Sequence, residues 1–86
     1  LRKATWLYDN GKPCAREANM AKYLCADAGF DAADRALQTH GGMGYSEEYN
    51  VARYFREARL TRIAPLSQEM VLNYIGEHVL GLPRSY

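Results

Sequence analysis

The feature that most limits the fold is a long helical pattern that runs from about Pro13 to Thr39. Small and apolar side chains recur in it every three or four residues, which predicts one long amphipathic helix. A column of small side chains follows one line of this helix and would let a neighbouring helix approach closely: Ala21, Cys25, Ala28, Ala32 and Ala36. Met20, Leu24, Phe30, Ala33 and Leu37 widen the apolar stripe.

Three shorter helical segments and no convincing strand accompany the long one. The first covers about residues 1–8 and stops at Asp9-Asn10-Gly11, a typical C-terminal signal. Gly41 and Gly42 end the long helix, and Ser46 is the predicted N-cap of a third helix that fades near Ile63.

Ser67 is the predicted N-cap of the last helix, which Gly81 and Pro83 stop. The pattern therefore predicts an all-α fold, an antiparallel helical bundle or part of one, with about four helices.

Length and charge limit the classes of function. The 86 residues make one domain or part of one, and they begin at Leu1 inside a helical pattern, so we expect a piece of a longer protein. A net charge of +1 gives no electrostatic reason to expect nucleic acid or an anionic membrane as partner. No apolar run is long enough to span a bilayer, and Cys14 and Cys25 read as reduced thiols of an intracellular protein. No Cys/His cluster predicts a metal site.

The stretch QTHGGMGY, residues 38–45, holds three glycines directly after the long helix. Its simplest interpretation is a helix C-cap followed by a turn. A glycine-rich backbone ahead of a helix N-terminus can also hold an anion, because unpaired N–H groups point outward. The spacing fits neither a P-loop nor a dinucleotide fingerprint after a strand, so the residues alone leave both interpretations open.

Other polar residues give weaker patterns. Arg53, Arg56, Arg59 and Arg62 are spaced by three and predict a solvated face or a subunit interface with ion pairs rather than a nucleic-acid site. His40 and His78 have no ligand-spaced partner and are interpreted as structural. Ser67, Glu77 and His78 do not form a hydrolase triad, because Ser67 has no nucleophile elbow.

Taken together, residues 32–63, AADRALQTHGGMGYSEEYNVARYFREARLTRI, resemble the C-terminal helical domain of the acyl-CoA dehydrogenases. The family pattern is a helix that ends in Gln-x-x-Gly-Gly-x-Gly-Tyr, followed by an acidic stretch, an arginine-rich helix and Arg-Ile. The segment NGKPCAREANMAKYLCADAG, residues 10–29, is similar to the preceding helix of the family and its approach. The resemblance thus spans nearly the whole chain.

The resemblance implies an oxidoreductase of fatty acid metabolism that binds FAD and oxidises an acyl-CoA thioester between its α and β carbons. In that case Gln38, Thr39, His40, Gly41 and Gly42 line the ADP part of an FAD held mainly by a neighbouring subunit, and Ser67 and Glu69 lie near the same FAD. Bare peptide groups at Gly41 and Gly42 would let the main chain approach the cofactor closely.

One departure from the family pattern affects the chemistry. Many members read Tyr-Glu-Gly-Thr after Arg-Ile, and that glutamate is the catalytic base, whereas Pro65 stands at its position here and cannot accept a proton. Glu69 aligns with a cofactor-side position and is not taken as the base. No catalytic residue is therefore assigned within this chain, and the base lies on an upstream helix or the chemistry has changed.

The remaining expectations follow from the same resemblance. The fragment alone is expected to be inactive and the full-length protein to be a dimer or tetramer, with an acyl-CoA substrate and with electron-transfer flavoprotein open as a partner. The location would be the cytoplasm, or the mitochondrial matrix in a eukaryote. The alternatives are a non-catalytic helical assembly domain of an inactive relative, or a free-standing helical adaptor.

Overall fold

The computed structural model describes residues 1–85, in which every regular element is a helix. The helices are α1 (Arg2–Asp9), α2 (Ala15–Thr39), α3 (Gly42–Tyr45), α4 (Val51–Leu60) and α5 (Gln68–His78). The all-α prediction is confirmed, as are the four predicted helices. The fifth helix, α3, is a single turn that the glycine-rich stretch forms in addition.

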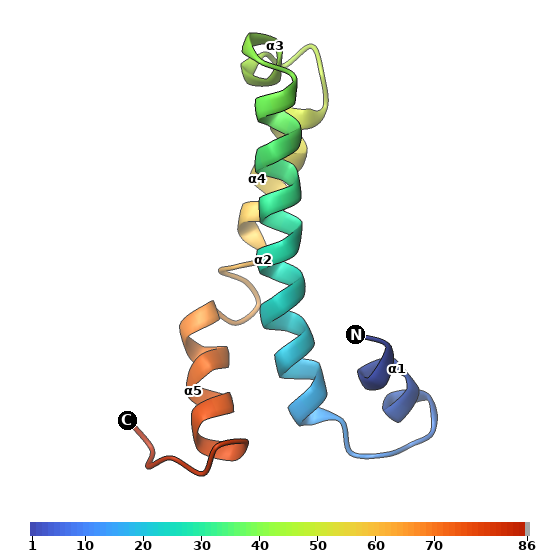
Figure 1. Cartoon of the computed structure of the whole chain (residues 1–86), viewed down its shortest axis with the longest axis vertical. Helices are drawn as coiled ribbons and strands as arrows, with labels where there is room; N and C mark the ends of the chain where they lie inside the picture. The colour runs from blue at the N-terminus through green and yellow to red at the C-terminus, as the bar shows by residue number, and fades with distance from the viewer. Residues whose placement is uncertain (86) are drawn as a thin grey trace.

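α2 is the axis of the molecule, and every other helix packs against it (Figure 1). α4 and α5 run antiparallel to α2 and follow one another along the same side of it, while α1 lies near its N-terminal end on another side (Figure 1). The overall extents are 46 × 33 × 18 Å. α4 passes behind α2 in the view down the shortest axis, so these two helices stack along the 18 Å dimension (Figure 1).

The buried apolar residues are small and are spread over α1, α2, α4 and α5. They comprise Ala4, Ala26, Val51, Ala52 and Val71. Where α2 meets α4, the Phe30 and Phe55 rings lie 5.2 Å apart between centroids, and the guanidinium groups of Arg59 and Arg62 lie over the Phe30 ring at 5.8 and 5.4 Å. The last two residues of the arginine row thus face α2 rather than solvent alone.

The column of small side chains on α2 does not form the packing surface for α4 and α5. Cys25, Ala28, Ala32 and Ala36 are exposed among the described residues, whereas Ala26 is buried and Phe30 half-buried on the face that meets α4. The sequence placed both lines on one apolar stripe. The structure packs the line through Ala26 and Phe30 against α4, where the Phe30 ring meets that of Phe55.

The predicted cap of the third helix is wrong. Ser46 follows α3 in an extended conformation, and its Oγ accepts a hydrogen bond from the Glu48 N–H at 3.2 Å within the loop. α4 begins five residues later, with Asn50 at its N-cap and no side-chain capping bond. The chain first closes the α3 turn, so the helix that Ser46 was expected to start is delayed. α4 also ends at Leu60, earlier than the expected end near Ile63.

Candidate functional site

The glycine-rich corner joins the end of α2 to α3 and lies at one end of the molecule (Figure 1). Gly41 has φ 59° and ψ −139°, a conformation that is essentially restricted to glycine. Its N–H donates to the Gln38 carbonyl at 3.0 Å, and its own carbonyl accepts from the Gly44 N–H at 2.9 Å. These bonds turn the chain sharply at the end of α2.

The other two glycines have different reasons to be glycine. A Cβ at Gly44 would lie 2.3 Å from the Leu37 carbonyl oxygen, so the contact between α3 and α2 excludes a side chain there. A Cβ at Gly42 would meet nothing within 4 Å. Within the described residues, neither backbone conformation nor packing requires glycine at position 42, which leaves its surface free for an approaching group.

The polar side chains before Gly41 are exposed at this corner. Thr39 Oγ1 donates to the Arg35 carbonyl at 2.8 Å. His40 Nδ1 lies 2.8 Å from the Ala36 carbonyl oxygen, and the His40 ring packs beside the Tyr49 ring with centroids 5.7 Å apart. The sequence did not single out Tyr49, because its position in the loop gives no periodic signal.

The second group of predicted site residues lies at the start of α5. Ser67 caps this helix as predicted, since its Oγ accepts a hydrogen bond from the Met70 N–H at 3.3 Å. The Glu69 carboxylate accepts hydrogen bonds from its own backbone N–H and from the Ser67 hydroxyl, and Arg59 and Arg62 add their positive charges. These contacts lower the pKa of Glu69, which makes its carboxylate a weaker base.

A buried amide fastens the start of α5 to α2. Gln68 is only 7% exposed, and its Nε2 donates to Asp27 Oδ1 at 2.9 Å and more weakly to the Tyr23 carbonyl at 3.4 Å. The same Asp27 oxygen pairs with Arg62 Nη2 at 2.9 Å. Gln68 Oε1 is buried without a protein partner in the described part of the chain. The sequence did not predict this cluster. Its only signal was the polar Gln68 directly after the Ser67 cap.

The two predicted groups do not lie together within one chain. Gln68 contacts α2 at Asp27, and His40 follows Asp27 by thirteen positions. At 1.5 Å per residue the two groups are about 20 Å apart along α2. Pro65, at the position of the family base, precedes α5 and is exposed.

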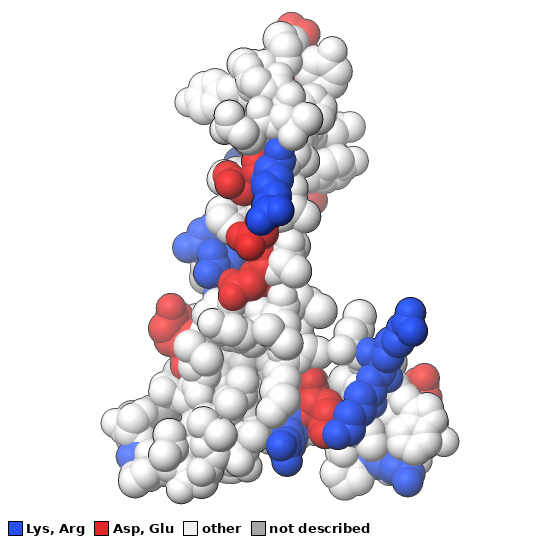
Figure 2. Space-filling view, in the orientation of Figure 1, with Lys and Arg blue, Asp and Glu red and all other residues white. Residues whose placement is uncertain are grey.

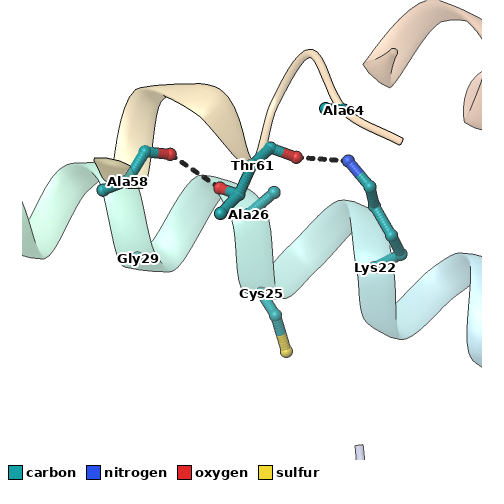
Figure 3. A pocket seen from close by; sticks show the side chains of 7 residues that line it. All are labelled: Lys22, Cys25, Ala26, Gly29, Ala58, Thr61 and Ala64. Atoms are coloured by element: carbon teal, nitrogen blue, oxygen red, sulfur yellow. Dashed lines mark hydrogen bonds between the residues drawn. The ribbon is translucent and has the colours of Figure 1, made fainter. Parts of the chain in front are cut away.

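A separate groove lies between α2 and the end of α4. It has a volume of about 300 Å³ and an almost entirely apolar lining, formed by Lys22, Cys25, Ala26, Gly29, Ala58, Thr61 and Ala64. Figure 3 shows Lys22 reaching to the Thr61 carbonyl, while the Cys25 thiol points away from the groove. Without convergent polar groups, this groove indicates helix packing rather than a reactive site.

Charges of both signs alternate over the visible face of the molecule, and the end that holds α3 is mainly uncharged (Figure 2). Residues 1–85 contain no group of three His, Cys, Asp or Glu side chains placed to hold a metal ion. None of their helices is long and apolar enough to cross a membrane.

Comparison with known proteins adds a family to this geometry. The family model described as "Acyl-CoA dehydrogenase, C-terminal domain" matches residues 1–80. Acyl-CoA dehydrogenase FadE12 of Mycobacterium tuberculosis and its counterpart in Mycobacterium bovis are each 53% identical to this chain over 87 aligned positions. The alignment covers 99% of this chain and 22% of each relative. The chain thus spans about a fifth of the length of these curated relatives.

Two solved structures have similar folds. Butyryl-CoA dehydrogenase from Megasphaera elsdenii superimposes with a TM-score of 0.86 at 38% identity, over 92% of this chain and 21% of that one. A chain from a structure described as the electron transferring flavoprotein of Acidaminococcus fermentans gives the same TM-score and coverage at 30% identity.

Proposed function

We propose, because this chain belongs to the acyl-CoA dehydrogenase family, that the whole protein is an FAD-dependent enzyme that oxidises an acyl-CoA thioester between its α and β carbons. The chain would contribute part of the cofactor site and of an oligomer interface. The observation that carries the proposal is a family match over nearly the whole chain, centred on an exposed glycine corner whose Gly42 has open space beside it.

The residues of the corner fit a dinucleotide. Gln38, Thr39 and His40 are exposed polar side chains, and Gly42 lets another molecule approach the main chain. When bound, FAD supplies the acceptor for the hydride that leaves the β carbon. Ser67 and Glu69 lie about 20 Å away along α2. We infer that they serve the far end of an extended FAD or the FAD of another subunit.

Removal of the α proton needs a base, and this chain offers none at the expected place. Pro65 has no proton acceptor in its side chain, and the lowered pKa of Glu69 suits a carboxylate that stays ionised rather than one that takes up a proton. We infer that the base comes from a part of the whole protein outside these residues. Glu69→Gln should then keep measurable exchange of the substrate α proton, and complete loss with FAD bound would assign the base to Glu69.

The test uses the full-length protein. The purified protein should show the visible absorption of oxidised flavin, and one member of a panel of acyl-CoAs should bleach it under anaerobic conditions. Gly42→Val should weaken FAD retention at least tenfold. The matched control is Gly29→Val, because a Cβ at Gly29 would also meet nothing within 4 Å. This variant should retain FAD. A colourless protein that cannot be reconstituted with FAD, or equal FAD affinity of both variants, would contradict the proposal for the corner.

Pro65 also favours a second candidate, a non-catalytic relative in which this domain serves assembly alone. Such a protein would bind flavin without being bleached by any acyl-CoA, or would bind no flavin and remain oligomeric. A cytoplasmic or mitochondrial-matrix location, a dimeric or tetrameric state, and electron-transfer flavoprotein as acceptor belong to the first proposal.

A further inference from the structure

The chain that follows α5 turns back on the helix. Gly81 has φ 69°, a left-handed conformation that favours glycine, and it reverses the direction of the main chain. The next residues cross the end of α5 instead of leading away from it (Figure 1). We call residues 81–85 the tail. The family model matches residues 1–80, so the tail lies just outside the matched region.

A backbone hydrogen bond attaches the tail to α5. The Leu82 N–H donates to the Gly76 carbonyl at 2.9 Å. Because α5 ends at His78, Gly76 belongs to its last turn, whose carbonyls lack the N–H groups that a longer helix would supply. The Leu80 N–H bonds to the Ile75 carbonyl at 3.1 Å and so does not serve Gly76. Leu82 therefore satisfies a carbonyl that α5 itself leaves open.

The Leu82 side chain packs where α5 has no side chain. A Cβ at Gly76 would lie 3.8 Å from Leu82 Cδ1, which is an ordinary van der Waals distance. An alanine would thus fit beneath Leu82, whereas a longer side chain would take the space that Leu82 fills. Leu82 combines a backbone bond and an apolar contact at one place on the helix.

The rest of the tail packs less closely. Ser85 Oγ donates to Asn73 Oδ1 at 3.5 Å, which is at the limit of a hydrogen bond. A hollow of about 220 Å³ remains between the tail and α5. All five residues of the tail are exposed to solvent. Few buried contacts oppose the opening of such a segment, so its attachment and release should be frequent compared with unfolding of the whole domain.

We propose that the tail is a latch on α5. When Leu82 is attached, the C-terminal end of the helix is closed. When Leu82 is released, with Gly81 as the hinge, the last turns of α5 unwind. The first turn stays on α2, because Gln68 is 7% exposed and bonds to Asp27 at 2.9 Å, which gives that end an anchor of its own. The inference does not depend on FAD binding or on catalysis.

The test is native-state hydrogen exchange of the full-length protein, with residues 68–72 and 74–80 read separately. Leu82→Ala removes the apolar contact, and Gly81→Val places a β-branched side chain at a positive φ that it rarely adopts. Gly11→Val is the matched control, because Gly11 has φ 63° and follows α1 as Gly81 follows α5.

Leu82→Ala and Gly81→Val should each speed exchange in residues 74–80 about threefold to tenfold, the effect of one lost hydrogen bond. Exchange in residues 68–72 should change less than about twofold, because the Gln68 anchor remains. Gly81→Asn should have a smaller effect than Gly81→Val, since asparagine tolerates the left-handed conformation. Gly11→Val should leave both parts of α5 unchanged.

Three results would overturn the inference. Unchanged exchange of residues 74–80 in both Leu82→Ala and Gly81→Val would show that the tail does not hold α5. Equal acceleration of residues 68–72 and 74–80 would show that α5 opens as one unit without a separate latch. An equal response of α5 to Gly11→Val would show that the effect is not local to the tail.

Discussion

The contact between Asp27 and Gln68 gives a direct prediction about how α5 is held. Asp27→Ala removes the closer of the two partners that Gln68 Nε2 has among residues 1–85, and the Gln68 side chain is 7% exposed. Leaving a buried donor without its partner costs about 1–3 kcal/mol, and the 3.4 Å contact with the Tyr23 carbonyl offsets part of this. We expect the amide bond to account for about 1.5 kcal/mol.

The ion pair between Asp27 and Arg62 adds less. Their side chains are 37% and 35% exposed, so water screens the pair and its loss costs about 0.5 kcal/mol. Arg62 also keeps its position over the Phe30 ring. The sum is about 2 kcal/mol, and since 1.4 kcal/mol is a tenfold change in an equilibrium constant, opening of α5 should become about 30-fold more frequent.

Native-state hydrogen exchange of the full-length protein measures this opening, read from peptides that cover α5. Asp27→Asn is the matched control, because it keeps an oxygen acceptor for Gln68 Nε2 and removes only the charge that pairs with Arg62. It should speed exchange about threefold or less. Equal effects of the two variants would show that the ion pair holds α5, and unchanged exchange in Asp27→Ala would refute the role of the amide.

Three further predictions concern the corner, the α5 cap and α1. Gly44→Ala should destabilise the protein by about 1–3 kcal/mol in thermal unfolding, because the new Cβ would clash with the Leu37 carbonyl. Gly42→Ala, at a glycine with open space beside it, should change stability by less than about 0.5 kcal/mol. Ser67→Ala should cost about 1 kcal/mol by removing the N-cap, seen as faster exchange at the start of α5, and Ser67→Asp should restore most of it. Lys3 Nζ on α1 lies 3.0 Å from Glu17 Oε1 on α2, and this hydrogen bond lowers the pKa of Glu17. A carboxylate whose pKa is lower in the folded state stabilises the fold above its unfolded pKa. That stabilisation is lost as the pH falls through the folded pKa. Exchange in α1 should therefore rise on acidification below about pH 4.3 in the original protein, and Glu17→Gln should abolish that pH dependence.

Local sequence signals predicted a helix start correctly where a single capping residue determines it. Ser67 begins α5 because its hydroxyl satisfies an orphan N–H, and no tertiary contact competes with that bond. Ser46 carries the same signature, with two glutamates behind it, but its hydroxyl bonds to the N–H only two residues ahead. The difference comes from α3, a turn set by Gly41 and by the contact of Gly44 with Leu37, which lies beyond the reach of a local pattern.

The choice of packing face on α2 shows a second limit. Periodicity marked both the small-residue line and the line through Phe30, and only the position of Phe55 on α4 decides between them. The candidate site likewise has a part that could be predicted from the sequence and a part that depends on tertiary contacts. The resemblance to the family indicated Gln38–Gly42 as a group, and these residues are also neighbours in the chain. The pairing of His40 with Tyr49 and that of Gln68 with Asp27 depend on where separate segments meet.

The arrangement around α2 has a consequence for how the domain tolerates change. α1 and α5 each touch α2 and do not touch each other. Damage to one outer helix should therefore leave the other with its original protection, and the energetic effects of paired substitutions in α1 and α5 should simply add. A substitution in α2 can affect several outer helices at once, because α1, α3, α4 and α5 all pack against α2. Genetic variation should accordingly be more freely accepted at the edges of the domain than along its central helix.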